Sequence, residues 1–190
     1  MPRRSLRLGI VIASLCAGAV VGLPSTGESW ARQQHAAICR SDLAMHWSFS
    51  GWSYYDIEWH GSGVRADGSA VSLFCPFVDD RVGSNFMHRT ATAVFVDVID
   101  CTQTGRVRAQ ACVQNLAGNS FACGTAAETT DSGSGASELN LPLSQWSWSG
   151  HASWYPYVYV GLPGPGSVTT GACAGISGRS SMLGFYAEGT

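Results

Sequence analysis

The chain has 190 residues, 45% of them hydrophobic, and a formal net charge of −2 at pH 7. All eleven basic residues are arginines, and this slightly acidic balance offers no basic surface for phosphates, so we expect no nucleic-acid partner. The chain has no lysine to form a Schiff base, which excludes Schiff-base enzymes, including those that use pyridoxal phosphate. We expect no cofactor.

Residues 1–31 have the features of an export signal. Three arginines lie within the first seven residues, and the apolar stretch 8–23 is too short and too rich in glycine for a membrane span. Small residues precede Arg32, where we expect the cut; a cut after Ala19 is the alternative. The mature chain is then one domain, 32–190, with no stable membrane span. We expect it to be secreted, periplasmic or at the cell surface.

Six cysteines remain in the expected mature domain, and an even number in an exported chain predicts three disulfides. None of them has C-x-x-C spacing, and they are scattered along the chain, so we expect no metal site. We expect one bridge to tie the N-terminal arm to the strand that ends at Cys75. That bridge is Cys39–Cys75, and the other pairings stay open. The six residues are Cys39, Cys75, Cys101, Cys112, Cys123 and Cys173.

Two β-branched runs, 90–101 and 106–113, flank the segment T-Q-T-G, which is typical of a hairpin with a four-residue loop. Valines occupy one face of the first run and Phe95 and Ile99 the other, so we expect a central strand covered on both sides. Further strands are predicted in an aromatic hairpin over 45–60, and at 70–75, 121–129 (weakened by Gly124), 139–143 (placed at an edge by Pro142), 152–160, 168–173 and 180–187.

No stretch of a dozen residues has a helical period, and turns rich in glycine and proline separate the short runs. The pattern predicts an all-β fold: a single-domain antiparallel β-sandwich, jelly-roll-like in its strand order and linked by disulfides.

The order of several segments resembles that of small secreted bacterial β-sandwich proteins, a family without a characterised activity. These segments are F-C-P-F at 74–77, the strand 93–100, Cys112, Y-V-Y-V-G-L-P at 157–163 and the final strand 184–188. The resemblance implies the same disulfide-containing fold over Cys75 to Glu188. Many of those proteins have a cysteine where this chain has Gly161, so the pairing need not be shared.

Aromatic residues are the one feature that points to function. A Trp or Tyr on an outer face can stack on a sugar ring or anchor a partner, although rings also fill the space between sheets. We expect the tyrosines of strand 152–160 to be exposed, because Trp154, Val158 and Val160 take its other face. The candidate ligand-binding residues are Trp146, Trp148, Tyr155, Tyr157 and Tyr159.

These observations favour a non-catalytic secreted module for binding or structure, whose partner is a cell-surface protein or a glycan; a carbohydrate-binding module is one alternative. No nucleophile elbow, zinc-protease motif, phosphate loop or dinucleotide motif is present. The other alternative is an exported hydrolase, with Glu58, Asp79 or Asp97 forming a carboxylate pair about 5 to 10 Å apart. Asp97 lies among valines and needs hydrogen bonds or a raised pKa.

Overall fold

The computed structural model describes residues 30–41, 57–60, 63–77, 81–82, 85–86, 90–115, 120–130, 135–144 and 154–189. For Trp30 and for the ranges 57–60, 81–82 and 85–86 it describes the backbone alone. Residues 1–29 of the expected signal, the side chain of Glu58, and Asp79, Trp146 and Trp148 lie outside the described residues.

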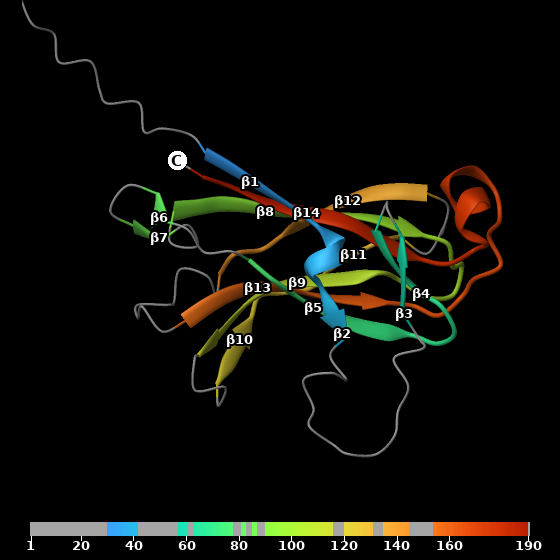
Figure 1. Cartoon of the computed structure of the whole chain (residues 1–190), viewed down its shortest axis with the longest axis horizontal. Helices are drawn as coiled ribbons and strands as arrows, with labels where there is room; N and C mark the ends of the chain where they lie inside the picture. Colours follow the sequence, from blue (N-terminus) through green and yellow to red (C-terminus); the bar gives the residue numbers. More distant parts are fainter. Residues whose placement is uncertain are drawn as a thin grey trace, which may run out of the picture.

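Two six-stranded antiparallel sheets face each other, which confirms the predicted disulfide-linked β-sandwich (Figure 1). The first sheet has the order β12 (Gly135–Leu141), β8 (Ala91–Asp100), β14 (Ser181–Gly189), β4 (Gly63–Ala66), β3 (Ile57–His60), and β1 (Trp30–His35) also pairs with β14. The second has the order β10 (Phe121–Cys123), β9 (Arg108–Asn115), β13 (Trp154–Leu162), β5 (Val71–Pro76), β2 (Arg40–Ser41), and β11 (Ala127–Glu128) also pairs with β9. A small separate pair is formed by β6 (Arg81–Val82) and β7 (Asn85–Phe86). A jelly-roll order stays a prediction.

The core lies between the inner faces of the two sheets. Alternate residues of β8 and β13 are fully buried there, which is the two-residue period that the sequence of each strand encodes. Phe77, just after β5, packs edge-on against Phe185 of β14, with ring centroids 4.6 Å apart. Among the described residues, the largest fully buried side chains are Phe185, Leu73, Leu141, Leu162, Met182, Val64, Val94, Val96 and Val98.

β8 is flanked by β12 and β14, as expected for an inner strand, but its outer face is only half-buried. The expectation that a layer covers both faces is therefore wrong. On the outer face Phe95 stacks on Tyr186 of β14, with ring centroids 4.8 Å apart. A neighbouring side chain of the same sheet thus covers Phe95, whereas Ile99 on the same face packs against the small cluster of Cys101, Val168 and Cys173.

The predicted hairpin between β8 and β9 is wrong, because the two strands belong to different sheets. Residues 101–107 cross from one sheet to the other. Their backbone cannot pair as in a hairpin, and the carboxylate of Asp100 supplies acceptors instead. Asp100 Oδ1 accepts from the Thr102 amide at 3.0 Å and Oδ2 accepts from the Val107 amide at 3.4 Å.

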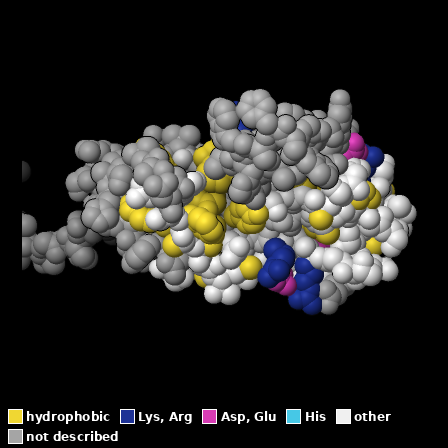
Figure 2. Space-filling model, turned by 90° about the horizontal axis from the view of Figure 1, so that it is seen from below, with side chains coloured by type: hydrophobic (Ala, Val, Ile, Leu, Met, Phe, Trp, Pro, Cys, Tyr) yellow, Lys and Arg dark blue, Asp and Glu magenta, His cyan; other side chains and the backbone are white. Residues whose placement is uncertain are grey.

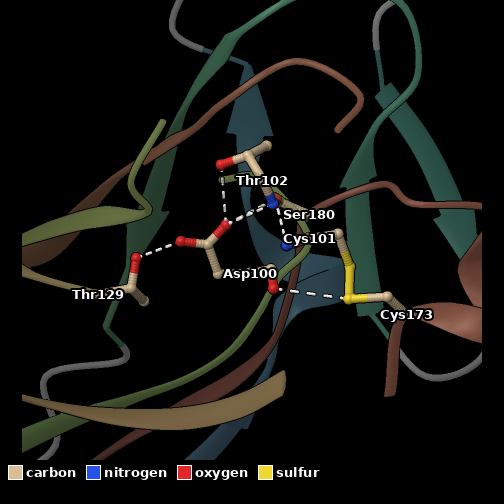
Figure 3. The surroundings of a disulfide bond; sticks show 6 residues. All are labelled: Asp100, Cys101, Thr102, Thr129, Cys173 and Ser180. Carbon is tan, nitrogen blue, oxygen red and sulfur yellow. Dashed lines mark hydrogen bonds between the residues drawn. A yellow bond between two sulfur atoms is a disulfide. The ribbon is translucent and has the colours of Figure 1, made fainter. Parts of the chain in front are cut away.

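Asp100 is the one buried charged side chain in the described part of the chain. Figure 3 shows that Thr102, Thr129 and Ser180, which come from three separate segments, surround its carboxylate. Their hydroxyls all donate to it, Thr102 at 3.1 Å and Ser180 at 3.3 Å. A buried carboxylate is tolerated only with such a set of donors. The network therefore fixes the crossing between the sheets at this end of the sandwich.

Three disulfides link the fold: Cys39–Cys75, Cys101–Cys173 and Cys112–Cys123. The first confirms the expected pairing. It joins β5 to the segment that leaves β1, forms the 3-10 helix η1 (Ala36–Ile38) and enters β2 in the opposite sheet. Its two sulfurs lie 3.7 and 3.6 Å from the sulfur of Met182 in the core. The N-terminal arm is thereby fixed across one edge of the sandwich.

Two predicted breaks are confirmed and one predicted strand is wrong. Gly124 separates β10 from β11, and a side chain there would place Cβ 2.5 Å from the carbonyl oxygen of Pro142. β12 lies at a sheet edge and ends just before Pro142. The expected strand 168–173 is replaced by the 3-10 helix η5 (Gly171–Ile176). Gly171 has φ 59°, outside the extended region, and Cys173 is tied to Cys101.

Candidate functional site

The outer face of the second sheet carries a group of aromatic side chains, which we call the aromatic face: Phe74, Phe121, Tyr155, Tyr157 and Tyr159. Strand register sets them in rows across the sheet. Phe121 of β10 lies opposite Gln114 of β9, which lies opposite Tyr155 of β13. Two rows further along, Tyr159 lies between Gln110 and Phe74. Because directly paired residues share a face, these side chains all point away from the core.

The exposure of the aromatic face changes along β13. Phe121 is 72% exposed and Tyr155 46% exposed, whereas Tyr159 is half-buried. Exposure of Tyr155 agrees with the prediction. Tyr157, however, is only 6% exposed, so the prediction that the whole tyrosine row is exposed is wrong for this residue.

Tyr157 is buried because its neighbours on the outer face are large. The ring of Phe74 lies against it, with ring centroids 4.4 Å apart and planes tilted by 32°. On the other side its register partner is Cys112, and the Tyr157 hydroxyl lies 3.9 Å from the sulfur of Cys123. The disulfide and Phe74 thus enclose Tyr157 and hold its ring in place beside the two exposed rings.

Charged side chains lie next to β9 and β11, at one end of the aromatic face. Glu128 accepts from Arg106 at 3.1 Å and from Arg108 at 2.8 Å. Figure 2, which views the molecule from this side, shows a band of hydrophobic side chains with this arginine and glutamate cluster beside it. Glu128 therefore neutralises part of the arginine charge at this end of the aromatic face.

The outer face of the first sheet is acidic. Asp97 of β8 lies directly opposite Glu138 of β12, and Tyr186 of β14 donates a hydrogen bond of 2.8 Å from its hydroxyl to Glu138. Burial, together with the negative charge of Glu138, raises the pKa of Asp97. The hydrogen bond to Glu138 is the largest of the causes that raise the pKa of Tyr186 to about 12.

The pair formed by Asp97 and Glu138 is the arrangement that acid and base chemistry would use, with one carboxyl more readily protonated than usual. Asp97 and Asp100 lie on opposite faces of β8 and so do not form such a pair. Within the described residues no group of three His, Cys, Asp or Glu side chains is placed to hold a metal ion.

Two residues of these surfaces were missed by the sequence analysis. Phe121 follows the residues G-N-S and belongs to a short run that Gly124 interrupts, so its alternation with Ala122 is the only signal of its exposed side. Glu138 gives no signal alone, because its pairing with Asp97 depends on the register of β12 against β8. The predicted ligand-binding residues Trp146 and Trp148 lie outside the described residues.

No family model, curated protein or solved structure matches this chain. The resemblance to small secreted bacterial β-sandwich proteins therefore stays a prediction. In the described part of the chain, no helix has the length and apolar character needed to cross a membrane. The three intramolecular disulfides fit a protein that folds in an oxidising compartment.

Proposed function

We propose that the protein is an exported, non-catalytic binding module, secreted, periplasmic or held at the cell surface, whose aromatic face docks on a cell-surface ligand. The single observation that carries this proposal is the pair of exposed rings, Phe121 and Tyr155, on either side of Gln114. Exposed aromatic rings held on a rigid sheet provide a large apolar contact area with little loss of conformational entropy on binding.

The surroundings of the two rings support a rigid binding surface. The buried Tyr157 lies on the same face of the sheet. The Cys112–Cys123 disulfide joins the strands that carry Phe121 and Gln114. The rings therefore stand on antiparallel strands that are linked covalently as well as by backbone hydrogen bonds. Such pre-organisation lowers the entropic cost of binding.

A glycan is the ligand class that these side chains suit best. Two rings provide stacking surfaces, and the amide of Gln114 between them can donate and accept hydrogen bonds with hydroxyl groups. Both neighbouring arginines are paired with Glu128, which takes up part of their charge and so weakens their attraction for an anionic ligand. A protein partner with an apolar patch is the other ligand that the rings would fit.

A glycan array probed with the oxidised protein tests this proposal. We expect binding to a set of neutral glycans that falls at least tenfold, about 1.4 kcal/mol, for Phe121→Ala and for Tyr155→Ala. Ile38→Ala is the matched control, because Ile38 is also an exposed apolar residue, 39% exposed, but lies on η1. Binding that all three variants retain would contradict the aromatic face as the binding surface.

A hydrolase is the second candidate, and the Asp97–Glu138 pair is the observation that favours it. Purified protein would then hydrolyse glycosides, and Glu138→Gln would abolish the turnover while leaving the fold intact. Turnover that is absent from the wild-type protein across a glycoside panel supports the binding module. Turnover that disappears in Glu138→Gln would replace it with the hydrolase.

A further inference from the structure

We propose that the Cys112–Cys123 disulfide is a redox-sensitive bond: a dithiol reductant opens it while the other two disulfides stay closed, and β10 then separates from β9. The reductant is a small dithiol or the dithiol of an oxidoreductase. The opening itself is independent of the proposed function. Only its consequence for ligand binding, through the loss of Phe121 from the aromatic face, rests on that proposal.

The three disulfides differ in their exposure to solvent. Both cysteines of Cys39–Cys75 and both cysteines of Cys101–Cys173 are fully buried. In the third bridge Cys112 is fully buried, but Cys123 is only half-buried. A thiolate must reach a sulfur atom to exchange with it, so Cys123 is the sulfur that a reductant can attack while the protein is folded.

The two buried bridges are also fixed by their surroundings. Cys39 and Cys75 belong to the main core and contact Met182 of the opposite sheet. Cys173 lies 3.5 Å from the carbonyl oxygen of Asp100, next to the buried network of Figure 3. A reductant would have to open the core to reach either of these bridges.

The element that the third disulfide secures is short and lies at an edge. β10 has three residues and stands at the end of the strand order of its sheet; among the described strands it pairs with β9 alone. Its first residue, Phe121, is 72% exposed and so adds little packing. Beyond the strand pairing, hydrogen bonds at its ends run from Asn115 N to Ser120 O, from Gly124 N to Ala111 O and from the Gln110 side chain to Gly124 O. Release of β10 therefore leaves the core between the sheets in place.

The exchange is a balanced two-step reaction. A thiolate of the reductant attacks Cys123 Sγ, the bond between the two cysteines breaks, and Cys112 leaves as a thiolate that takes up a proton. The second thiol of the reductant then attacks the mixed disulfide and releases Cys123 as a thiol. The protein gains two thiols, and the reductant becomes a disulfide.

Differential alkylation under native conditions tests the proposal. The oxidised protein is treated with increasing dithiothreitol, alkylated, and mapped by peptide mass spectrometry. We expect Cys112 and Cys123 to become labelled at least about tenfold faster than the other four cysteines. Hydrogen exchange should rise at 120–124 in the same samples, while the core strands keep their protection. Equal labelling of Cys39 or Cys173, or labelling only when the whole domain unfolds, would overturn the proposal.

A monothiol and two matched variants sharpen the test. Glutathione should form its mixed disulfide on Cys123 and not on Cys112; the reverse would contradict the proposed order of attack. The double variant Cys112→Ser, Cys123→Ser should fold, with fast exchange confined to β10. Its counterpart Cys101→Ser, Cys173→Ser should lose protection across the domain. A Cys112→Ser, Cys123→Ser protein that fails to fold would refute an independently released β10.

The two proposals fail in different ways. If reduction opens Cys112–Cys123 alone and glycan binding falls, both are supported. If reduction opens this bond and binding to the array is unchanged, the redox-sensitive bond stands and the aromatic face is refuted as the binding surface.

Discussion

Asp97 and Asp100 lie three residues apart on β8, and opposite faces of the strand give them different surroundings. Asp100 points inward and accepts hydrogen bonds from backbone amides and hydroxyl groups of several segments. Asp97 points outward and faces the like charge of Glu138. Asp100 therefore stabilises the fold, whereas Asp97 destabilises it at neutral pH.

Replacing Asp100 by alanine should lower the free energy of unfolding by about 3 kcal/mol, because the buried amide of Thr102 and the hydroxyls of Thr129 and Ser180 lose their acceptor. Urea unfolding measures this loss. The matched control is Asp67→Ala, which removes a partly exposed ion pair with Arg179 and should change stability by less than about 1 kcal/mol. Equal effects of the two substitutions would show that the buried network is not structurally important.

Replacing Asp97 by asparagine should stabilise the protein at pH 7 by about 0.2 to 1 kcal/mol, the range for like charges opposed across a sheet. A raised pKa means that the folded state holds the proton more tightly, so the wild-type protein loses stability as the pH rises through the pKa of Asp97. The gain should therefore vanish below the ordinary pKa of 3.8. Urea midpoints at pH 7 and pH 3 test this; a gain that is larger at pH 3 would contradict it.

At the scale of the element, β13 carries two neighbouring outer-face tyrosines with different roles. Tyr157→Ala should cost about 3 kcal/mol of stability, because it leaves a cavity between Phe74 and the disulfide. Tyr155→Ala should cost less than about 0.5 kcal/mol, since Tyr155 is 46% exposed and lies on the surface. Thermal or urea unfolding of both variants decides the matter. A reversed order would show that Tyr155, and not Tyr157, is the structural ring.

Element by element, the sequence predicted strands well and their partners poorly. Alternation in β8 and β13 shows which residues face the core, and Pro142 and Gly124 mark the ends of their strands. The pairing of β8 with β12 and β14 was missed, because two β-branched runs around a short polar segment look alike in a hairpin and in a crossing between sheets. The distinguishing signal was Asp100, an acid on the inner face of a valine strand.

The candidate site could be predicted only in part, because the sequence did not show which strands pair with each other. Tyr155 was recognised from alternation along one strand. The burial of Tyr157 depends on Phe74, and the acidic pair depends on Glu138, and both neighbours come from strands distant in sequence. Contacts across strands depend on register, which a single sequence does not specify without knowledge of the topology.

At the scale of the whole molecule, the disulfides differ in how much each is expected to contribute to the free energy of unfolding. By closing a loop, each bridge lowers the entropy of the unfolded chain and so stabilises the fold. This contribution is about 3 kcal/mol for Cys112–Cys123, whose cysteines are 11 residues apart, and about 4 kcal/mol each for Cys39–Cys75 and Cys101–Cys173, at separations of 36 and 72. Full reduction should therefore remove much of a typical folding free energy of about 5 to 15 kcal/mol and lower the Tm sharply. Calorimetry with and without reductant measures this shift. An unchanged Tm with six free thiols would contradict a fold that depends on its disulfides.

Hydroxyl-radical footprinting tests the proposed binding role of the aromatic face most directly. Oxidised protein is exposed to radicals alone and with a cell-envelope fraction, and oxidation of each side chain is measured by mass spectrometry. We expect Phe121 and Tyr155 to become protected, while Ile38 and the opposite-face residues Phe95 and Tyr186 react as before. Protection of Phe95 and Tyr186, with Phe121 and Tyr155 unchanged, would contradict the account.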